Sequence, residues 1–142
     1  MKTVVINNDY GGYGLSDILV REYLTRKEIP FQEQESGNEY LQNAFFIIED
    51  GEEKRYYGNW SINREDPLLA ELVRQLGEGA NGPSADLKVQ EIEDGINYRI
   101  DEYDGWESLE CYVPVTLDEL SKGLSEEQMR LVKICGRVEL RD

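Results

Sequence analysis

The sequence has no histidine, and this absence excludes most of the catalytic templates that small enzymes use. Without an imidazole there is no Ser-His-Asp or Cys-His nucleophile activation and no HExxH zinc site. Paired carboxylates remain able to hydrolyse glycosides or to bind magnesium. With 30 acids in 142 residues, however, such pairs arise by chance. We therefore expect a protein that is not an enzyme and uses no cofactor and no metal, with a magnesium-dependent carboxylate enzyme as a remaining alternative.

Cysteines and long apolar runs are also scarce. The two cysteines, Cys111 and Cys135, are too far apart for a CxxC motif, so we expect both to be small buried apolar side chains. The longest apolar runs, at residues 4–6 and 45–48, are far shorter than the roughly 20 residues that a membrane span needs. The N-terminus lacks the pattern of a secretory signal. We expect a cytoplasmic protein with a single domain over residues 1–142.

Basic residues are half as frequent as acidic ones, and the net charge is −15. The imbalance is greatest in residues 91–127, where twelve acids face only Arg99 and Lys122. A negative field repels nucleic-acid phosphates and anionic membranes, so we expect no direct contact with nucleic acid or membrane. Two interpretations of the acidity remain open. It either keeps a solvated surface soluble or forms a surface that docks on a basic partner.

The first half of the chain predicts a strand, a helix and a hairpin. Residues 2–7 are rich in β-branched side chains and end at Asn7-Asn8-Asp9, which indicates a buried strand. Ser16 is a helix cap for residues 17–27. Residues 32–43 form a loop or a weakly ordered strand, and residues 44–49 and 54–59 flank the turn dipeptide Asp50-Gly51 of a hairpin.

The second half predicts one long helix, a second hairpin and two short helices. Asp66-Pro67 provides the cap and first-turn proline of a helix that ends at Gly77. Residues 87–92 and 96–102 surround Glu93-Asp94-Gly95 as a hairpin. Capping boxes precede helices at residues 117–121 and 126–135, the second with Met129, Val132 and Cys135 on one face. The fold class is α+β, a mixed or antiparallel sheet with two hairpins packed against two main helices, with residues 114–142 as a candidate C-terminal helical extension.

The glycine-rich segment between the first strand and the first helix is the first candidate site. A helix N-terminus preceded by glycines suits phosphate binding, because its N–H groups are unpaired and the backbone is accessible. The segment reads G-x-G-x-x-D from Gly12, however, and lacks the full dinucleotide or P-loop pattern. The alternative is a tight turn in which glycines take positive φ and Ser16 caps the helix. A bound nucleotide or signalling molecule requires Arg21 or Arg64 nearby. The candidate ligand residues are Asp9, Tyr10, Gly11, Gly12, Tyr13, Gly14, Ser16 and Arg21.

A segment of mixed aromatic and acidic residues, 98–107, is the second candidate site. Tyrosine and tryptophan are enriched at protein interfaces, where carboxylates meet arginines of the partner. Strand alternation produces the same pattern when the aromatics pack on the domain itself. Asp104-Gly105 is predicted to be a turn. The candidate partner-binding residues are Tyr98, Asp101, Glu102, Tyr103, Asp104, Trp106 and Glu107.

Three stretches of the chain resemble a family of small uncharacterised proteins associated with phages and prophages. They are residues 10–17 (YGGYGLSD), residues 64–77 (REDPLL and the helix after it) and residues 85–105, which end in EYDG. Members of that family end soon after the Tyr-Asp-Gly turn, often with a histidine-containing tail, whereas this chain continues and has no histidine. The resemblance implies a mobile-element origin and carries no known activity.

Acidity, aromatics and this resemblance together predict a binding protein. The leading hypothesis is a non-enzymatic phage or prophage protein whose acidic surface inhibits a basic, nucleic-acid-binding host protein, as a counter-defence protein would. Such a surface imitates a phosphate array and gains association rate from electrostatic steering. The alternative is a protein that binds or sequesters a nucleotide or signalling molecule at the glycine-rich turn.

Overall fold

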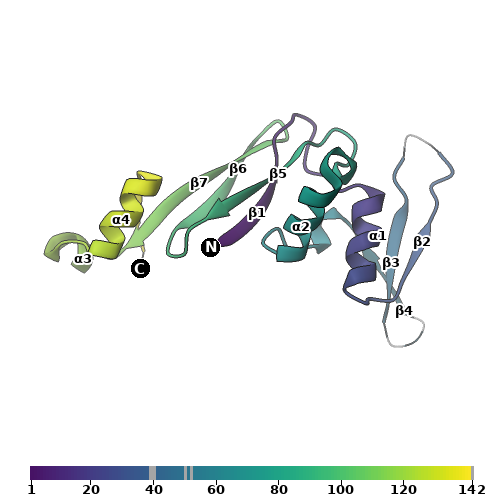
Figure 1. Ribbon diagram of the computed structural model, residues 1–142, viewed down its shortest axis with the longest axis horizontal. Coiled ribbons are helices and arrows are strands. Elements are labelled where there is room, and N and C mark those ends of the chain that lie inside the picture. The colour runs from purple at the N-terminus through teal and green to yellow at the C-terminus, as the bar shows by residue number, and fades with distance from the viewer. Residues whose placement is uncertain (39–40, 50, 52, 142) are drawn as a thin grey trace.

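The computed structural model describes residues 1–38, 41–49, 51 and 53–141, and these adopt an α+β fold. Three sheets are present in that part of the chain: a β1–β5 pair, β2–β3–β4 and β6–β7–β8. The helices α1 and α2 lie between the β1–β5 pair and the β2–β3–β4 sheet, while α3 and α4 lie at the opposite end (Figure 1). The strands are β1 (Lys2–Asn7), β2 (Phe31–Gln34), β3 (Ala44–Glu49), β4 (Glu53–Tyr57), β5 (Leu87–Ile92), β6 (Asn97–Tyr103), β7 (Trp106–Val115) and β8 (Val138–Leu140). The helices are α1 (Asp17–Arg26), α2 (Pro67–Leu76), α3 (Leu117–Lys122) and α4 (Glu126–Cys135).

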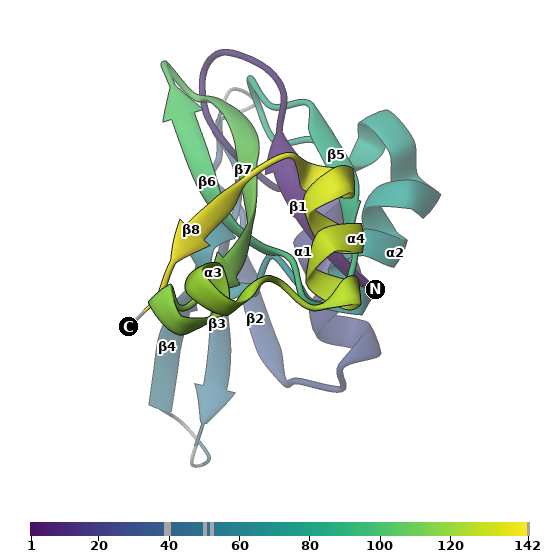
Figure 2. The same ribbon diagram turned by 90° about the vertical axis from the view of Figure 1, so that its left-hand side faces the viewer.

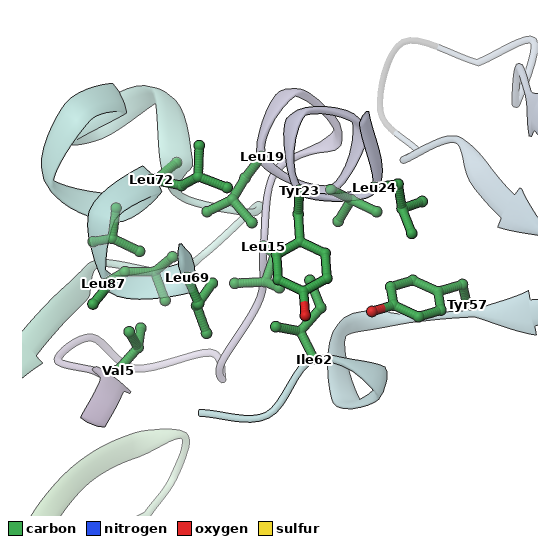
Figure 3. Packing of buried hydrophobic residues seen from close by; sticks show 14 of the residues in the cluster. Val5, Leu15, Leu19, Tyr23, Leu24, Tyr57, Ile62, Leu69, Leu72 and Leu87 are labelled. Atoms are coloured by element: carbon green, nitrogen blue, oxygen red, sulfur yellow. The ribbon is translucent and has the colours of Figure 1, made fainter. Parts of the chain in front are cut away.

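Strand β1 connects two hydrophobic cores, because its alternating side chains point to opposite faces. Val5 belongs to a first core with α1, α2 and the β3–β4 hairpin, part of which is drawn in Figure 3. Val4 and Ile6 belong to a second core with β7 and α4, where Leu131 is 3% exposed. This explains why residues 4–6, at the centre of β1, form a continuous apolar run. A strand that is buried on both faces cannot alternate between apolar and polar side chains.

The predicted helix boundaries are confirmed by their caps. The Ser16 side chain accepts a hydrogen bond from the Leu19 N–H, and Asp66 accepts one from the Leu68 N–H with Pro67 in the first turn. Thr116 and Ser125 form the two expected capping boxes. In α4, Val132 and Cys135 of the predicted face pack against the second core, but Met129 is 48% exposed and the most buried side chain is Leu131.

The first predicted hairpin is confirmed, and the second is wrong. β3 and β4 pair antiparallel, although Asp50 of the predicted turn lies outside the described residues. β5 does not pair with β6. It pairs antiparallel with β1, and β6 pairs antiparallel with β7 through the turn at Asp104-Gly105. That turn is the real hairpin connection, since Asp104 has φ of 50° and Gly105 φ of 90°, the left-handed conformation that a two-residue hairpin requires.

The C-terminal segment is part of the fold rather than a purely helical extension. β8 pairs parallel with the end of β7, and α4 packs on β7 with Leu131 in the second core (Figure 2). β7 and β8 were both missed by the sequence prediction. Both cysteines are only half-buried against this core, and burial raises the pKa of the Cys111 thiol. No helix in the described part of the chain is long and apolar enough to span a membrane.

Candidate functional site

The two candidate sites predicted separately from the sequence lie against each other. The Gly11 N–H donates to the Asp104 carbonyl at 3.3 Å, which joins the glycine-rich loop to the β6–β7 turn. The Tyr10 ring of that loop packs on the Trp106 ring of the hairpin with centroids 5.3 Å apart. The hairpin tip and the glycine-rich loop therefore form one structural unit.

A single buried amide fixes this unit to the end of β1. Asn7 is fully buried, and its Nδ2 donates to the carbonyls of Asp9 and Gly105, both at 2.8 Å. Its Oδ1 accepts from the Asp86 N–H at 2.8 Å. Three segments that are distant in sequence thus meet on one side chain, which uses its acceptor and both donors. A buried amide with all its hydrogen bonds made specifies a unique arrangement of the chain around it.

The glycines serve close packing of backbone segments. A Cβ on Gly105 would lie 2.4 Å from the Gly12 nitrogen, and one on Gly82 would lie 2.7 Å from the Gly14 carbonyl carbon. Gly11 and Gly12 both have positive φ, at 113° and 107°. These contacts support the tight-turn interpretation, because backbone atoms of the hairpin turn occupy the surface of Gly11 and Gly12 that a phosphate would need.

The start of α1 is likewise filled by the protein's own groups. The Ser16 hydroxyl donates to the Gly79 carbonyl at 2.6 Å while it caps the helix. The Asp17 carboxylate accepts from the Asn43 N–H at 3.0 Å. Arg21 forms two hydrogen bonds of 2.7 Å with Glu33, which hold its pKa above its ordinary value, and it does not reach the glycine-rich loop. The predicted ligand site with Ser16 and Arg21 is therefore not assembled.

The outer face of the hairpin carries an aromatic and acidic surface. Asp101 pairs with Ser108 across the strands and Tyr103 with Trp106, so all four share one face. With Tyr10 they line a hollow of about 190 Å³. Tyr103 is 77% exposed, Tyr10 56% and Trp106 41%. We name this surface, formed by Tyr10, Asp101, Tyr103, Trp106 and Ser108, the outer patch.

The carboxylates of the hairpin tip are divided between structural and free groups. Asp101 and Asp104 are exposed, and within the described residues no lysine or arginine forms an ion pair with either. Arg99, the cation nearest in sequence, pairs with Glu110 and Glu139 instead. Asp9 is also exposed, and its carboxylate accepts from the Tyr10 N–H. The tip therefore presents negative charge that the fold does not use.

Glu107 is a correction to the predicted partner-binding set. It is only 4% exposed, and its two oxygens accept from Arg64 Nη1 at 2.6 Å and Nη2 at 2.8 Å. The Asn7 N–H donates to the same carboxylate at 2.9 Å. A buried carboxylate with three charge-assisted or backbone hydrogen bonds is structural. It holds β7 to β1 and to the segment that precedes α2, so it is not one of the exposed carboxylates of the hairpin.

Tyr98 also lies apart from the outer patch. Its hydroxyl donates to the Glu65 carboxylate at 2.5 Å, and the Lys2 ammonium lies 5.5 Å from its ring centroid. Burial, followed by the Glu65 hydrogen bond, raises the pKa of Tyr98 to about 12. This residue joins β6 to the start of the chain, so the structure does not group it with the exposed aromatics.

Arg64 organises the inner face of the hairpin. Its Cζ lies 3.6 Å from the Tyr13 ring centroid and 5.0 Å from that of Trp60, and the two rings are 5.6 Å apart. Burial raises the pKa of Tyr13 to about 12, an effect that the Arg64 charge opposes and the Glu107 charge reinforces. The buried Tyr13 hydroxyl has no hydrogen-bond partner among the described residues.

A cleft of about 500 Å³ opens beside this cluster. We name it the inner cleft. It is lined by Gly12, Tyr13, Trp60, Arg64, Ile100, Glu102, Gly105 and Glu107. The sequence analysis did not identify Trp60 as a site residue, because nothing in its neighbours indicates that it contacts Tyr13, 47 positions earlier. The Arg64 side chain does approach the glycine-rich loop, but Glu107 already neutralises it.

Comparisons with protein-family models, curated proteins and solved structures find no match for this chain. Within the described residues, no group of three or more cysteine, aspartate or glutamate side chains is arranged to hold a metal ion. The outer patch and the inner cleft lie on the two faces of the β6–β7 hairpin.

Proposed function

We propose that this protein is a non-enzymatic binding protein whose outer patch engages a basic surface of another protein. The observation that carries the proposal is the 77% exposure of Tyr103 beside carboxylates that pair with no lysine or arginine of the described chain. A cluster of exposed aromatic side chains indicates a binding surface. Tyr and Trp side chains that become buried on binding contribute much of the affinity of an interface. The turn beneath them is fixed by Asn7, so the patch is held rigid before a partner arrives.

The negative charge of the protein indicates which class of partner it binds. The net charge of −15 includes the tip carboxylates of Asp101, Glu102 and Asp104, with which no lysine or arginine of the described residues forms an ion pair. A field of this sign steers basic surfaces toward the protein and repels acidic ones. Surfaces that normally bind nucleic-acid phosphates fit this requirement. We therefore propose that the partner is a nucleic-acid-binding protein and that occupation of its basic site inhibits it.

The biological setting in this proposal comes from the resemblance to phage-associated proteins. A mobile element gains from a small acidic protein that blocks a host protein, and a counter-defence role belongs to this class. The alternative role, capture of a nucleotide at the glycine-rich loop, has less support. The hairpin turn packs against the backbone of that loop, and the two arginines predicted to assist a ligand, Arg21 and Arg64, are paired with glutamates.

The test uses charge removal at the tip with a matched control. The site variant is Asp101→Asn with Glu102→Gln and Asp104→Asn, which preserves side-chain shape and keeps a residue that tolerates the positive φ at position 104. The control variant neutralises Glu28, Glu35 and Glu78, which are exposed and belong to segments outside the β6–β7 hairpin. Both variants change the net charge by the same amount.

Each protein is immobilised and incubated with host-cell lysate at low and at high salt, and the bound proteins are identified by mass spectrometry. The proposal predicts a salt-sensitive basic protein that binds the wild type and the control variant but is lost with the site variant. Roughly tenfold slower association of the purified partner with the site variant is expected at low salt. Equal binding of that partner to the site and control variants would refute the proposal.

A further inference from the structure

The inner cleft contains an exposed aromatic surface that the fold does not use. Trp60 is 75% exposed, more than Trp106 of the outer patch, although an indole is among the most favourable side chains to bury. Trp60 contacts the Tyr13 ring on one side, and the cleft of about 500 Å³ lies next to it. An indole that is supported from beneath and open above is a platform for a planar or cationic group.

Arg64 shows which chemistry this environment accepts. Its guanidinium stacks on Tyr13 and makes a two-pronged contact with Glu107, the arrangement in which Arg pairs with an aromatic face and a carboxylate at once. Glu107 already accepts three hydrogen bonds, two from Arg64 and one from the Asn7 N–H, and the Arg64 charge offsets its own. It therefore has little capacity for a second cation.

Glu102 has that capacity. It lies opposite Glu107 in the β6–β7 register and lines the same cleft. It accepts one hydrogen bond, from the Gly105 N–H at 2.6 Å, and no lysine or arginine of the described chain forms an ion pair with it. With Arg64 and Glu107 neutralising each other, the cleft retains one negative charge beside an open indole.

We propose that the inner cleft receives the guanidinium of an arginine side chain from the basic partner, stacked on Trp60 and hydrogen-bonded to Glu102. This inference rests on the proposed function and extends it, because the partner would then hold the hairpin on both faces. Arginine fits better than lysine, since its planar fork matches a carboxylate and an aromatic face together. An anionic ligand is disfavoured by the two carboxylates in the cleft and by the net charge of −15.

The two tryptophans provide a separate probe for each face, because the chain contains only Trp60 and Trp106. The indole N–H resonances of ¹⁵N-labelled protein are assigned with Trp60→Phe and Trp106→Phe. The protein is titrated with acetyl-Gly-Arg-Gly-amide, with the same peptide carrying lysine or the neutral isostere citrulline, and with adenosine monophosphate as an anionic planar probe.

The arginine peptide is expected to shift the Trp60 resonance more strongly than the lysine peptide, and citrulline and the nucleotide are expected to leave it in place. Glu102→Gln, which keeps an acceptor for the Gly105 N–H, should weaken the arginine titration about fivefold or more. The matched control Asp101→Asn removes one charge from the opposite face and should leave the Trp60 titration almost unchanged.

The outcomes separate the two proposals. If the arginine peptide shifts only the Trp106 resonance, or if Glu102→Gln binds as the wild type does, the cleft inference is wrong and the outer patch remains the binding surface. A Trp60 shift with the nucleotide but not with arginine also overturns it. If a variant with Asp101→Asn and Asp104→Asn, which leaves Glu102 in place, keeps its protein partner while Trp60 responds to arginine, the cleft inference survives and the proposed role of the outer patch fails.

Discussion

Both faces of the β6–β7 hairpin carry a carboxylate, but the inner one is bound within the fold and the outer one is exposed. On the inner face, Glu107 is 4% exposed and holds Arg64 in a buried ion pair. On the outer face, Asp101 is exposed and has no cationic partner in the described chain. The two residues are only six positions apart, and the local sequence does not indicate this difference. A carboxylate becomes structural when strand alternation turns it inward and a cation from a distant segment meets it.

The largest predicted effect comes from the inner face. Glu107→Gln leaves the Arg64 guanidinium largely buried without its counter-charge, which typically costs about 3–5 kcal/mol of unfolding free energy. Asp101→Asn should leave the free energy of unfolding close to that of the wild type. Urea unfolding of the three proteins, followed by tryptophan fluorescence, measures both changes. A Glu107→Gln variant as stable as Asp101→Asn would contradict the division between the faces.

A smaller effect is expected where the hairpin turn meets the glycine-rich loop. Gly105→Ala places a Cβ 2.4 Å from the Gly12 nitrogen at a φ of 90°. We expect a loss of about 2–4 kcal/mol, from left-handed strain together with the clash. Gly12→Ala is the matched control, because its φ is also positive but its Cβ would meet nothing within 4 Å.

The same unfolding assay compares these two glycine variants. Gly12→Ala should lose only the conformational contribution, about 1–2 kcal/mol. Equal losses at the two positions would show that the loop and the hairpin turn are not packed together, which would separate the outer patch from its support.

The smallest effect is expected at Tyr13, where the substitution should stabilise the protein rather than destabilise it. Its buried hydroxyl lacks a partner in the described chain, so Tyr13→Phe should raise the free energy of unfolding by about 1 kcal/mol. The pKa of Tyr13 rises from 10.0 to about 12 on folding, mainly through burial. The folded state therefore holds this proton more tightly than the unfolded chain does.

That shift predicts a pH dependence for Tyr13. The stability associated with its protonated hydroxyl is complete below pH 10 and is lost as the pH rises toward about 12. Unfolding measured from pH 8 to pH 12 should show a shallower decline for Tyr13→Phe than for the wild type. A decrease in stability at pH 8 in the variant would indicate that the hydroxyl is hydrogen-bonded in solution.

The sequence predicts the local elements well because their signals are local. Ser16, Asp66 and Thr116 cap helices by accepting hydrogen bonds from N–H groups two or three residues away. The local sequence alone therefore locates the start of each helix. Strand pairing is different. Residues 87–92 and 96–102 are separated by a good turn sequence, yet β5 pairs with β1, some 85 positions earlier, because that pairing closes both cores.

In the candidate site, too, local features were predicted and long-range contacts were not. Tyr103 and Trp106 were identified from aromatic and acidic composition and Tyr10 from the glycine-rich segment, and the structure brings the three together. Glu107 contacts Arg64, 43 positions away, and Trp60 contacts Tyr13, 47 positions away. No local pattern encodes either contact, so sequence reasoning gave Glu107 the wrong role and missed Trp60.

The central claim is that the free carboxylates at the hairpin tip, and not the buried one, bind a basic partner. Its most direct test is the association rate of an arginine-rich peptide with the wild type and with the Asp101→Asn, Glu102→Gln, Asp104→Asn variant, measured from low to high salt by stopped-flow fluorescence. The account predicts a rate that falls steeply with salt for the wild type and for the variant that neutralises Glu28, Glu35 and Glu78, and a slower, flatter response for the tip variant. Identical salt dependences for the two triple variants would contradict it, because they would show that net charge alone, and not the hairpin tip, attracts the partner.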